Sequence, residues 1–166
     1  MDSFALRQAQ EPLKEKYKIS PDAALVTLKA TSRIGDGITC KIETGKMMAE
    51  AGLHPATGGD GLSVCSGDML LEALAACAGV TLKAVATAID FDLKDALIHV
   101  EGDLDFRGTL SVDRNATVGF KDIRLNFQLD TTEPSDKIAT LLKLTERYCV
   151  VYQTLVKANT IEVSIK

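Results

Sequence analysis

The stretch CSGDMLLEALAACAGVTLKAVATAID, residues 65–90, decides how this chain of 166 residues folds. Ser66 and Asp68 are both good N-cap residues, so a helix is expected to begin near one of them and to continue through Ile89. Apolar residues occupy every side of this helix, a pattern typical of a helix buried in a core or in a subunit interface.

Cys77 lies midway along that helix. The field of a helix N-terminus fades within the first turn, so it gives a thiol at this position little help. If Cys77 is reactive, the sequence predicts that a cation from elsewhere in the chain holds it as a thiolate. The alternative is that Cys77 replaces alanine in a small-residue seam, because free cysteines are among the most buried residues.

Composition and charge exclude several classes of protein. The chain is long enough for one domain with its own core, and its 46% hydrophobic and 25% charged residues are ordinary for a soluble protein. The net charge of −4 argues against binding to nucleic acid. Glu72 and Lys83 leave only residues 73–82 of the apolar stretch without charge, too few for a membrane span. The N-terminus lacks the apolar core of a signal peptide, which predicts a cytoplasmic protein.

The four cysteines, Cys40, Cys65, Cys77 and Cys149, show no spacing typical of a zinc site, so no metal and no cofactor is expected. In a reducing compartment they should be thiols, and any disulfide between them would be transient or catalytic.

The rest of the chain alternates between strands and helices in the order of an α+β fold. A short helix over 4–17 is expected in an N-terminal extension, residues 1–20, and a hairpin is expected from strands at 24–30 and 38–42. Segment 44–67 is expected to be irregular, and its glycine-rich part GLHPATGGDG (residues 52–61) to form a functional lid or an ordered Ω-loop. Further strands are predicted at 96–106, 109–112, 119–130 and 161–165.

A second helix is predicted to begin at Pro134-Ser135. Its inner stripe has helical spacing and places Cys149 on the buried side. The stripe consists of Ile138, Leu141, Leu142, Thr145 and Cys149.

Four segments together resemble the OsmC/Ohr family of thiol-dependent peroxidases, the osmotically inducible and organic hydroperoxide resistance proteins. They are SGDMLLEALAACAGVTL with Cys77, VEGDLDF, GFKDIRLNFQLD, and ERYCVVYQTL with Cys149. The resemblance implies one OsmC-like domain over residues 1–166, with antiparallel sheets packed around long central helices. It also implies an intertwined homodimer with two active sites at the shared interface. The loop GLHPATGGDG resembles that of a less characterised branch of the family.

The same resemblance implies the site residues. Cys77 corresponds to the attacking cysteine and Cys149 to the resolving one. Arg33, in TSRIGDG, matches the arginine that supports the thiolate, and Asp68 is the nearest equivalent of the family's glutamate, which usually follows a proline. Val150 stands where the family usually has proline after the second cysteine.

Two residues are secondary candidates for the substrate pocket. Glu72 lies five residues before Cys77, offset by about 140° around the helix, and is not expected to be its direct partner. His54 could activate a thiol, but its place before Pro55 in a loop favours a turn-capping role.

The implied reaction reduces an organic hydroperoxide at Cys77, closes a Cys77–Cys149 disulfide and regenerates both thiols with an external dithiol of the lipoyl or thioredoxin type. Two alternatives remain open at this stage. One is a dimeric module that binds a small apolar ligand or senses redox state. The other is a cysteine hydrolase, for which no third residue of a triad is visible.

Overall fold

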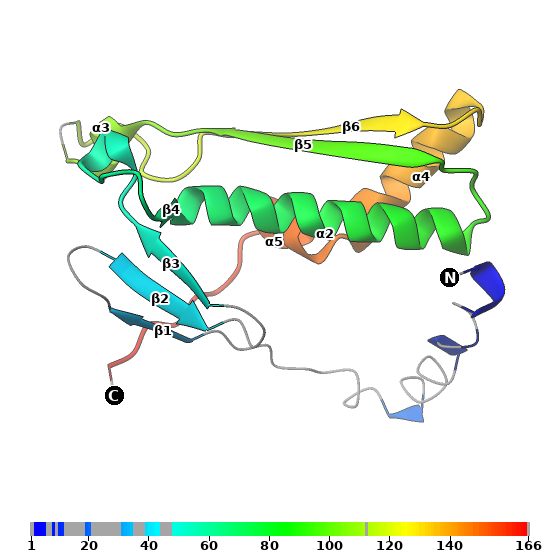
Figure 1. Cartoon of the computed structure of the whole chain (residues 1–166), viewed down its shortest axis with the longest axis horizontal. Helices are drawn as coiled ribbons and strands as arrows, with labels where there is room; N and C mark the ends of the chain where they lie inside the picture. Colours follow the sequence, from blue (N-terminus) through cyan, green and yellow to red (C-terminus); the bar gives the residue numbers. More distant parts are fainter. Residues whose placement is uncertain are drawn as a thin grey trace. The chain divides into compact units, whose positions relative to one another are not determined.

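The computed structural model describes residues 2–5, 8, 10–11, 19–20, 31–34, 39–43, 48–111 and 113–165, of which residues 31–34, 39–43 and 48 are described by their backbone alone. The chain forms two compact units, whose helices and strands are labelled in Figure 1. The first comprises Met1–Leu13, Ala73–His99 and Asn126–Lys166, and the second comprises Lys14–Glu72 and Val100–Leu125. Most of the predicted N-terminal helix over 4–17 lies outside the described residues.

Helix α2, Ser66–Ala88, confirms the predicted central helix. Asp68 in its first turn is a favourable charge for the helix dipole. The helix ends in a Schellman motif: Asp90 adopts a left-handed φ of 51°, and the Phe91 N–H bonds the Ala86 carbonyl at 2.8 Å. By length and composition, α2 is also the one helix in the described part of the chain that could span a membrane.

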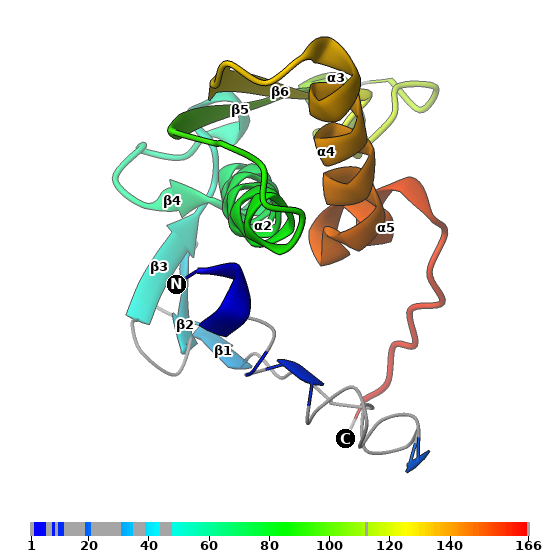
Figure 2. The same cartoon turned by 90° about the vertical axis from the view of Figure 1, so that its right-hand side faces the viewer.

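One face of α2 forms the core of the first unit. Leu82 and Ala86 pack with Leu141 of α4 (Ser135–Tyr148), and all three are almost completely buried. Partly buried side chains of the strands, including Ile98 and Phe127, surround this cluster. Figure 2 looks along α2 and shows α4 and α5 (Val150–Val156) beside it. This face of α2 is therefore part of a core.

Strands β5 (Asp95–Asp103) and β6 (Asp122–Asp130) form a two-stranded antiparallel sheet. Backbone bonds from Lys94 to Asp130 (3.0 Å) and from Lys121 to Asp103 (2.9 Å) close its two ends. Burial alternates along β6, which confirms the predicted strand with one wet face.

The predicted strand over 109–112 was wrong for residues 109–111, while Val112 lies outside the described residues, and β5 is shorter than the predicted 96–106. A helical turn, α3 (Phe106–Thr109), begins after β5 because the Asp105 side chain accepts the Arg107 N–H at 3.1 Å and caps it.

The second predicted helix is confirmed as α4, with Leu141, Thr145 and Cys149 buried. The predicted final strand over 161–165 was wrong. Ile161, Val163 and Ile165 are 83%, 92% and 100% exposed in a segment without regular structure. An alternating pattern makes a strand only where a ladder partner is present, and none pairs with this segment among the described residues.

The second unit contains a four-stranded sheet in the order β1-β2-β3-β4. Its strands are Thr31–Ile34, Thr39–Glu43, Met48–Gly52 and Val64–Cys65. The hairpin of β1 and β2 confirms the second predicted strand, while the first, at 24–30, lies outside the described residues, as does the turn after Ile34. Calling 44–67 irregular was partly wrong. The alanines and glycine of β3 give a weak strand signal, yet β3 pairs with β2 at five positions.

The glycine-rich segment of this unit contains a short 3₁₀ helix. His54 caps the 3₁₀ helix η2 (Pro55–Thr57), its Nδ1 accepting the Ala56 N–H at 3.0 Å. The His54 ring also stacks on Phe106, with centroids 4.9 Å apart. A side chain at Gly59 would collide with the Leu53 carbonyl, since its Cβ would lie 1.7 Å from that oxygen. Glycine is therefore required there by close packing.

Candidate active site at Cys77 and Cys149

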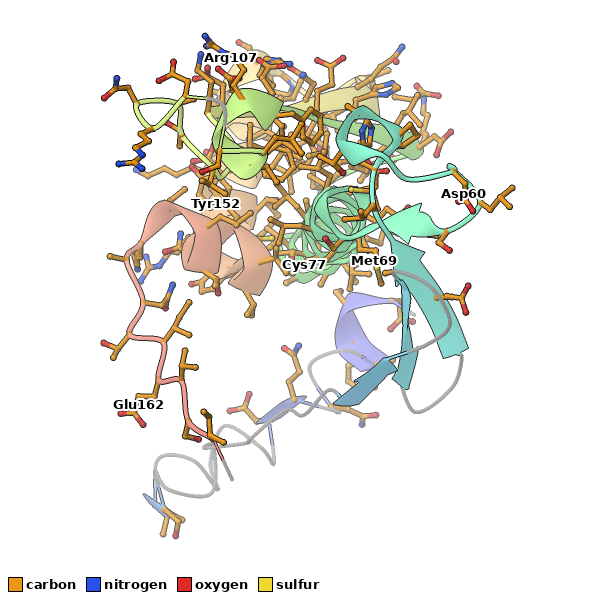
Figure 3. The ribbon with its side chains drawn as sticks, turned by 90° about the vertical axis from the view of Figure 1, so that its left-hand side faces the viewer. Asp60, Met69, Cys77, Arg107, Tyr152 and Glu162 are labelled. Carbon is orange, nitrogen blue, oxygen red and sulfur yellow. The ribbon has the colours of Figure 1, made fainter. Side chains whose placement is uncertain are left out.

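Two cysteines that are far apart in the sequence meet in the first unit. Cys77, half-buried, projects from the middle of α2, and Cys149, 1% exposed, lies at the junction of α4 and α5. Both are free thiols, and they are close enough for each to shift the pKa of the other. In Figure 3, Cys77 lies on the side of α2 that faces α5, the helix that carries Tyr152.

Cys149 occupies a break between two helices. Its backbone is extended, with φ −72° and ψ 108°, so α4 ends and α5 begins at the same residue. Its N–H still bonds the Thr145 carbonyl at 2.9 Å, and its carbonyl accepts the Gln153 N–H at 2.9 Å. The first N–H groups of α5 precede any intrahelical acceptor and need partners elsewhere.

The N–H groups of Val150 and Val151 act on the sulfur of Cys77, and those of Tyr152 and Val151 act on the sulfur of Cys149, in each case lowering the pKa of the thiol. The Cys149 side chain makes no cap hydrogen bond to α5. The Thr81 side chain, one turn after Cys77 on α2, is hydrogen-bonded to Cys77. Backbone N–H groups, a hydroxyl and a thiol therefore all act on Cys77.

These contacts make the pair chemically unequal. Burial acts to raise the pKa of the Cys77 thiol, but the hydrogen bonds from Val151, Cys149, Val150 and Thr81 outweigh it and hold that pKa below its ordinary value. Burial raises the pKa of Cys149, and the neighbouring Cys77 sulfur raises it further, in spite of the Tyr152 N–H. Cys77 therefore loses its proton more readily than Cys149, so Cys77 is the thiol that becomes the thiolate.

Among the described residues, neutral donors lower the pKa of Cys77, namely two backbone N–H groups, a hydroxyl and a thiol. The expectation that a cation from elsewhere in the chain also holds Cys77 as a thiolate stays a prediction. Sequence reasoning missed Thr81, although its position four residues after a cysteine on one helix is a usable signal. The Val150 and Val151 donors could not be found from the sequence, because they depend on the helix break at Cys149.

The other predicted support for Cys77 stays a prediction. Arg33 lies in β1 opposite Lys41, and its side chain is outside the described residues. Asp68 is exposed in the first turn of α2, and Glu72 is exposed one turn further on. Neither carboxylate belongs to the hydrogen-bonded group around Cys77.

His54 has a local structural role, because capping and stacking occupy both its Nδ1 and its ring. Within the described residues, no three histidine, cysteine or acidic side chains gather as metal ligands would. The chemistry of this site is that of the two thiols.

Comparison with known proteins relates most of the chain to one family. A family model described as OsmC-like protein matches residues 58–165, which include both cysteines. A search of curated proteins finds no match. Among solved structures, an OsmC-like protein from Mycoplasma pneumoniae aligns with a TM-score of 0.67 at 16% identity, covering 79% of this chain and 88% of that one.

Two further structures described as organic hydroperoxide resistance proteins have the same fold. The one from Legionella pneumophila aligns with a TM-score of 0.62 at 19% identity over 80% of this chain and 90% of that one. The one from Elizabethkingia anophelis aligns with a TM-score of 0.63 at 14% identity over 78% and 88%. Since the family model spans well over half of the 166 residues, the chain belongs to the OsmC-like protein family.

Proposed function

We propose that this protein is a thiol-dependent peroxidase that reduces organic hydroperoxides. The observation that carries the proposal is the neighbouring pair of Cys77 and Cys149, in which the pKa of Cys77 is lowered and that of Cys149 is raised. A nucleophile with a lowered pKa beside a second, protonated thiol is what a two-cysteine peroxidase needs. Two structural relatives are described as organic hydroperoxide resistance proteins, which agrees with this reaction.

The reaction follows from the positions of the two sulfurs. The half-exposed Cys77 thiolate attacks the outer oxygen of the hydroperoxide and the O–O bond breaks, so that Cys77 becomes a sulfenic acid and the organic part leaves as an alkoxide that takes a proton to become the alcohol. Cys149, already in contact with Cys77, then displaces the hydroxyl group and forms the disulfide. An external dithiol of the lipoyl or thioredoxin type reduces this disulfide by exchange.

Burial supports the two proposed roles. Cys149 is 1% exposed and out of reach of a bulky hydroperoxide, whereas Cys77 is partly open to solvent. We further propose that the protein acts as a homodimer in the cytoplasm, with Arg33 and Asp68 completing the site around Cys77.

Peptide mapping by mass spectrometry tests the reaction. Reduced protein treated with cumene hydroperoxide is expected to give the Cys77–Cys149 disulfide. Cys77→Ser should consume no peroxide, while Cys149→Ser should react once and then accumulate sulfinic acid, because no resolving thiol traps the sulfenic acid. Cys65→Ser is the matched control, a half-buried cysteine just before α2, and should behave as wild type.

If wild type and Cys77→Ser consume peroxide equally slowly, the peroxidase proposal is wrong. A dimeric module that binds a small apolar ligand or senses redox state, with these cysteines outside any catalytic cycle, would then be the better description.

A further inference from the structure

We propose that Gln153 is a positioning residue for Cys149: it bridges the break between α4 and α5 and holds the resolving cysteine in place for disulfide formation with Cys77. The inference rests on the proposed peroxidase reaction and adds a residue to it. Gln153 makes hydrogen bonds to the chain on both sides of the break, one through its backbone and one through its side chain.

The break at Cys149 deprives a helical carbonyl of its usual donor. In a continuous α-helix the Glu146 carbonyl would accept the N–H of Val150, four residues further on. The ψ of 108° at Cys149 ends α4 there and turns that N–H away from the helix. The Glu146 carbonyl is then one of the orphan acceptors of a helix C-terminus, which a side chain or water has to satisfy.

Gln153 supplies the missing donor. Its side-chain Nε2 donates to the Glu146 carbonyl at 2.9 Å, across a separation of seven residues. Its backbone N–H donates to the Cys149 carbonyl, also at 2.9 Å, as the first bond of α5. One residue of α5 therefore binds both the last turn of α4 and Cys149 itself.

The other polar group of the Cys149 backbone is bound to the core. The Cys149 N–H donates to the carbonyl of Thr145, a residue that is 1% exposed. The α4 side of the break is thus fixed by burial, and the Gln153 amide ties the α5 side to it. Gln153 is half-buried and its acceptor belongs to an exposed residue, so this bond competes with water and its effect is expected to be moderate.

The position of Cys149 matters because a disulfide accepts only a narrow geometry. The two Cα atoms have to lie about 4.4–6.8 Å apart, with the Cβ atoms about 3.5–4.5 Å apart. Cys77 is fixed by α2, whereas a backbone rotation at the break would move the Cys149 sulfur relative to it. A misplacement of about 1 Å can slow a reaction about 10²-fold. The Gln153 bridge restricts this rotation, so it acts on disulfide formation and not on the earlier attack by Cys77.

The test separates these two steps in a single turnover with cumene hydroperoxide. Trapping of the Cys77 sulfenic acid with dimedone gives the rate of attack, and the appearance of the Cys77–Cys149 disulfide without dimedone gives the rate of resolution. Gln153→Met keeps the length of the side chain and removes its donor. Gln153→Lys keeps a donor, and its cation suits the C-terminal end of α4.

Asn159→Leu is the matched control. The Asn159 side chain caps the other end of α5, where its Nδ2 donates to the carbonyls of Thr154 and Lys157 at 2.8 Å each. The variant therefore loses a comparable side-chain amide bond from the same helix without touching the break. A loss of helix stability alone would affect this control as much as Gln153→Met.

We expect Gln153→Met to slow resolution by about 3- to 10-fold and to leave the rate of attack unchanged. Gln153→Lys should resolve at close to the wild-type rate, and Asn159→Leu should keep both rates. Unchanged resolution in Gln153→Met, or equal slowing in either of the other two variants, would overturn the positioning role and leave the peroxidase proposal intact. A wild type that forms no Cys77–Cys149 disulfide with the peroxide would overturn both.

A competition measurement with a second variant keeps the result independent of how well Gln153→Met folds. The Cys77 sulfenic acid is either resolved by Cys149 or oxidised by a second hydroperoxide, which leaves as the alcohol, to sulfinic acid. Gln153→Asn keeps the amide but is one methylene too short for the bridge. The peroxide concentration that converts half of Cys77 to sulfinic acid should fall by about 3- to 10-fold in Gln153→Asn. The same concentration as in wild type would reject the proposal.

Discussion

The Thr81 side chain is hydrogen-bonded to the sulfur of Cys77, one turn earlier on α2. Threonines elsewhere in these helices use their hydroxyls differently. Thr87 donates to the Lys83 carbonyl and Thr145 to the Leu141 carbonyl, each at 2.8 Å and four residues back. Thr81 therefore acts on the thiol, and its removal should be measurable in the chemistry of Cys77.

Replacing Thr81 with valine should raise the pKa of Cys77, because the thiolate loses a donor while the side-chain shape is kept. A smaller fraction of Cys77 is then thiolate at neutral pH, so alkylation by iodoacetamide slows and its pH profile moves to higher pH. Thr81→Ser, which keeps the hydroxyl, should restore the wild-type profile. Thr87→Val on the same helix is the matched control, and an equal shift in both valine variants would contradict the assignment.

Val150→Pro should raise the pKa of Cys77 by a different route, since proline has no N–H to donate to it. The substitution suits the site. Val150 is the first residue of α5, its side chain is 69% exposed, and Cys149 already has the extended backbone that precedes proline. Stability should change by no more than about 1 kcal/mol. The thiolate's ultraviolet absorbance, followed against pH, should shift for Val150→Pro and stay unchanged for Val150→Ala, which keeps the N–H.

The sequence was sufficient to predict the elements with strong periodicity. Three patterns each predicted one kind of element, and all three elements were confirmed. They are the all-apolar run of α2, the alternation of β6 and the helical stripe that ends at Cys149. The pairing of Cys77 with Cys149 was predicted from the family resemblance rather than from periodicity. Helical spacing alone places each thiol on a buried face without saying that the two faces meet.

What could not be predicted depends on tertiary context. Strand β3 exists because β2 offers it a ladder, and residues 161–165 stay irregular because no described strand pairs with them. The donors Val150 and Val151 act only because Cys149 interrupts two helices that the sequence presents as one continuous pattern.

Leu82→Ala should destabilise the protein by about 2–5 kcal/mol. Leu82 is 1% exposed and packs with Leu141 in the core of the first unit, so its loss leaves a cavity between α2 and α4. Urea unfolding followed by circular dichroism measures the change. Leu97→Ala removes the same atoms from a side chain that is 53% exposed on β5, and it should lower the free energy of unfolding much less. An equal decrease for both variants would show that the burial of Leu82 in this core does not stabilise the protein.

Val80→Asp should dissociate the proposed homodimer. Val80 lies in the middle of α2 but is 72% exposed, and Ala73 and Ala76 on the same helix are exposed too. Small and apolar side chains let a second helix approach closely, so a second copy of α2 is the expected cover for this face. An unpaired charge buried there costs about 3–5 kcal/mol, which corresponds to a dissociation constant raised by at least about 10²-fold. Sedimentation or light scattering over a range of concentrations should find dimers for wild type and monomers for Val80→Asp. The control Leu97→Asp, which places the charge on the solvent-exposed face of β5, should remain a dimer. A wild type that is already a folded monomer at micromolar concentration would rule out this role for α2.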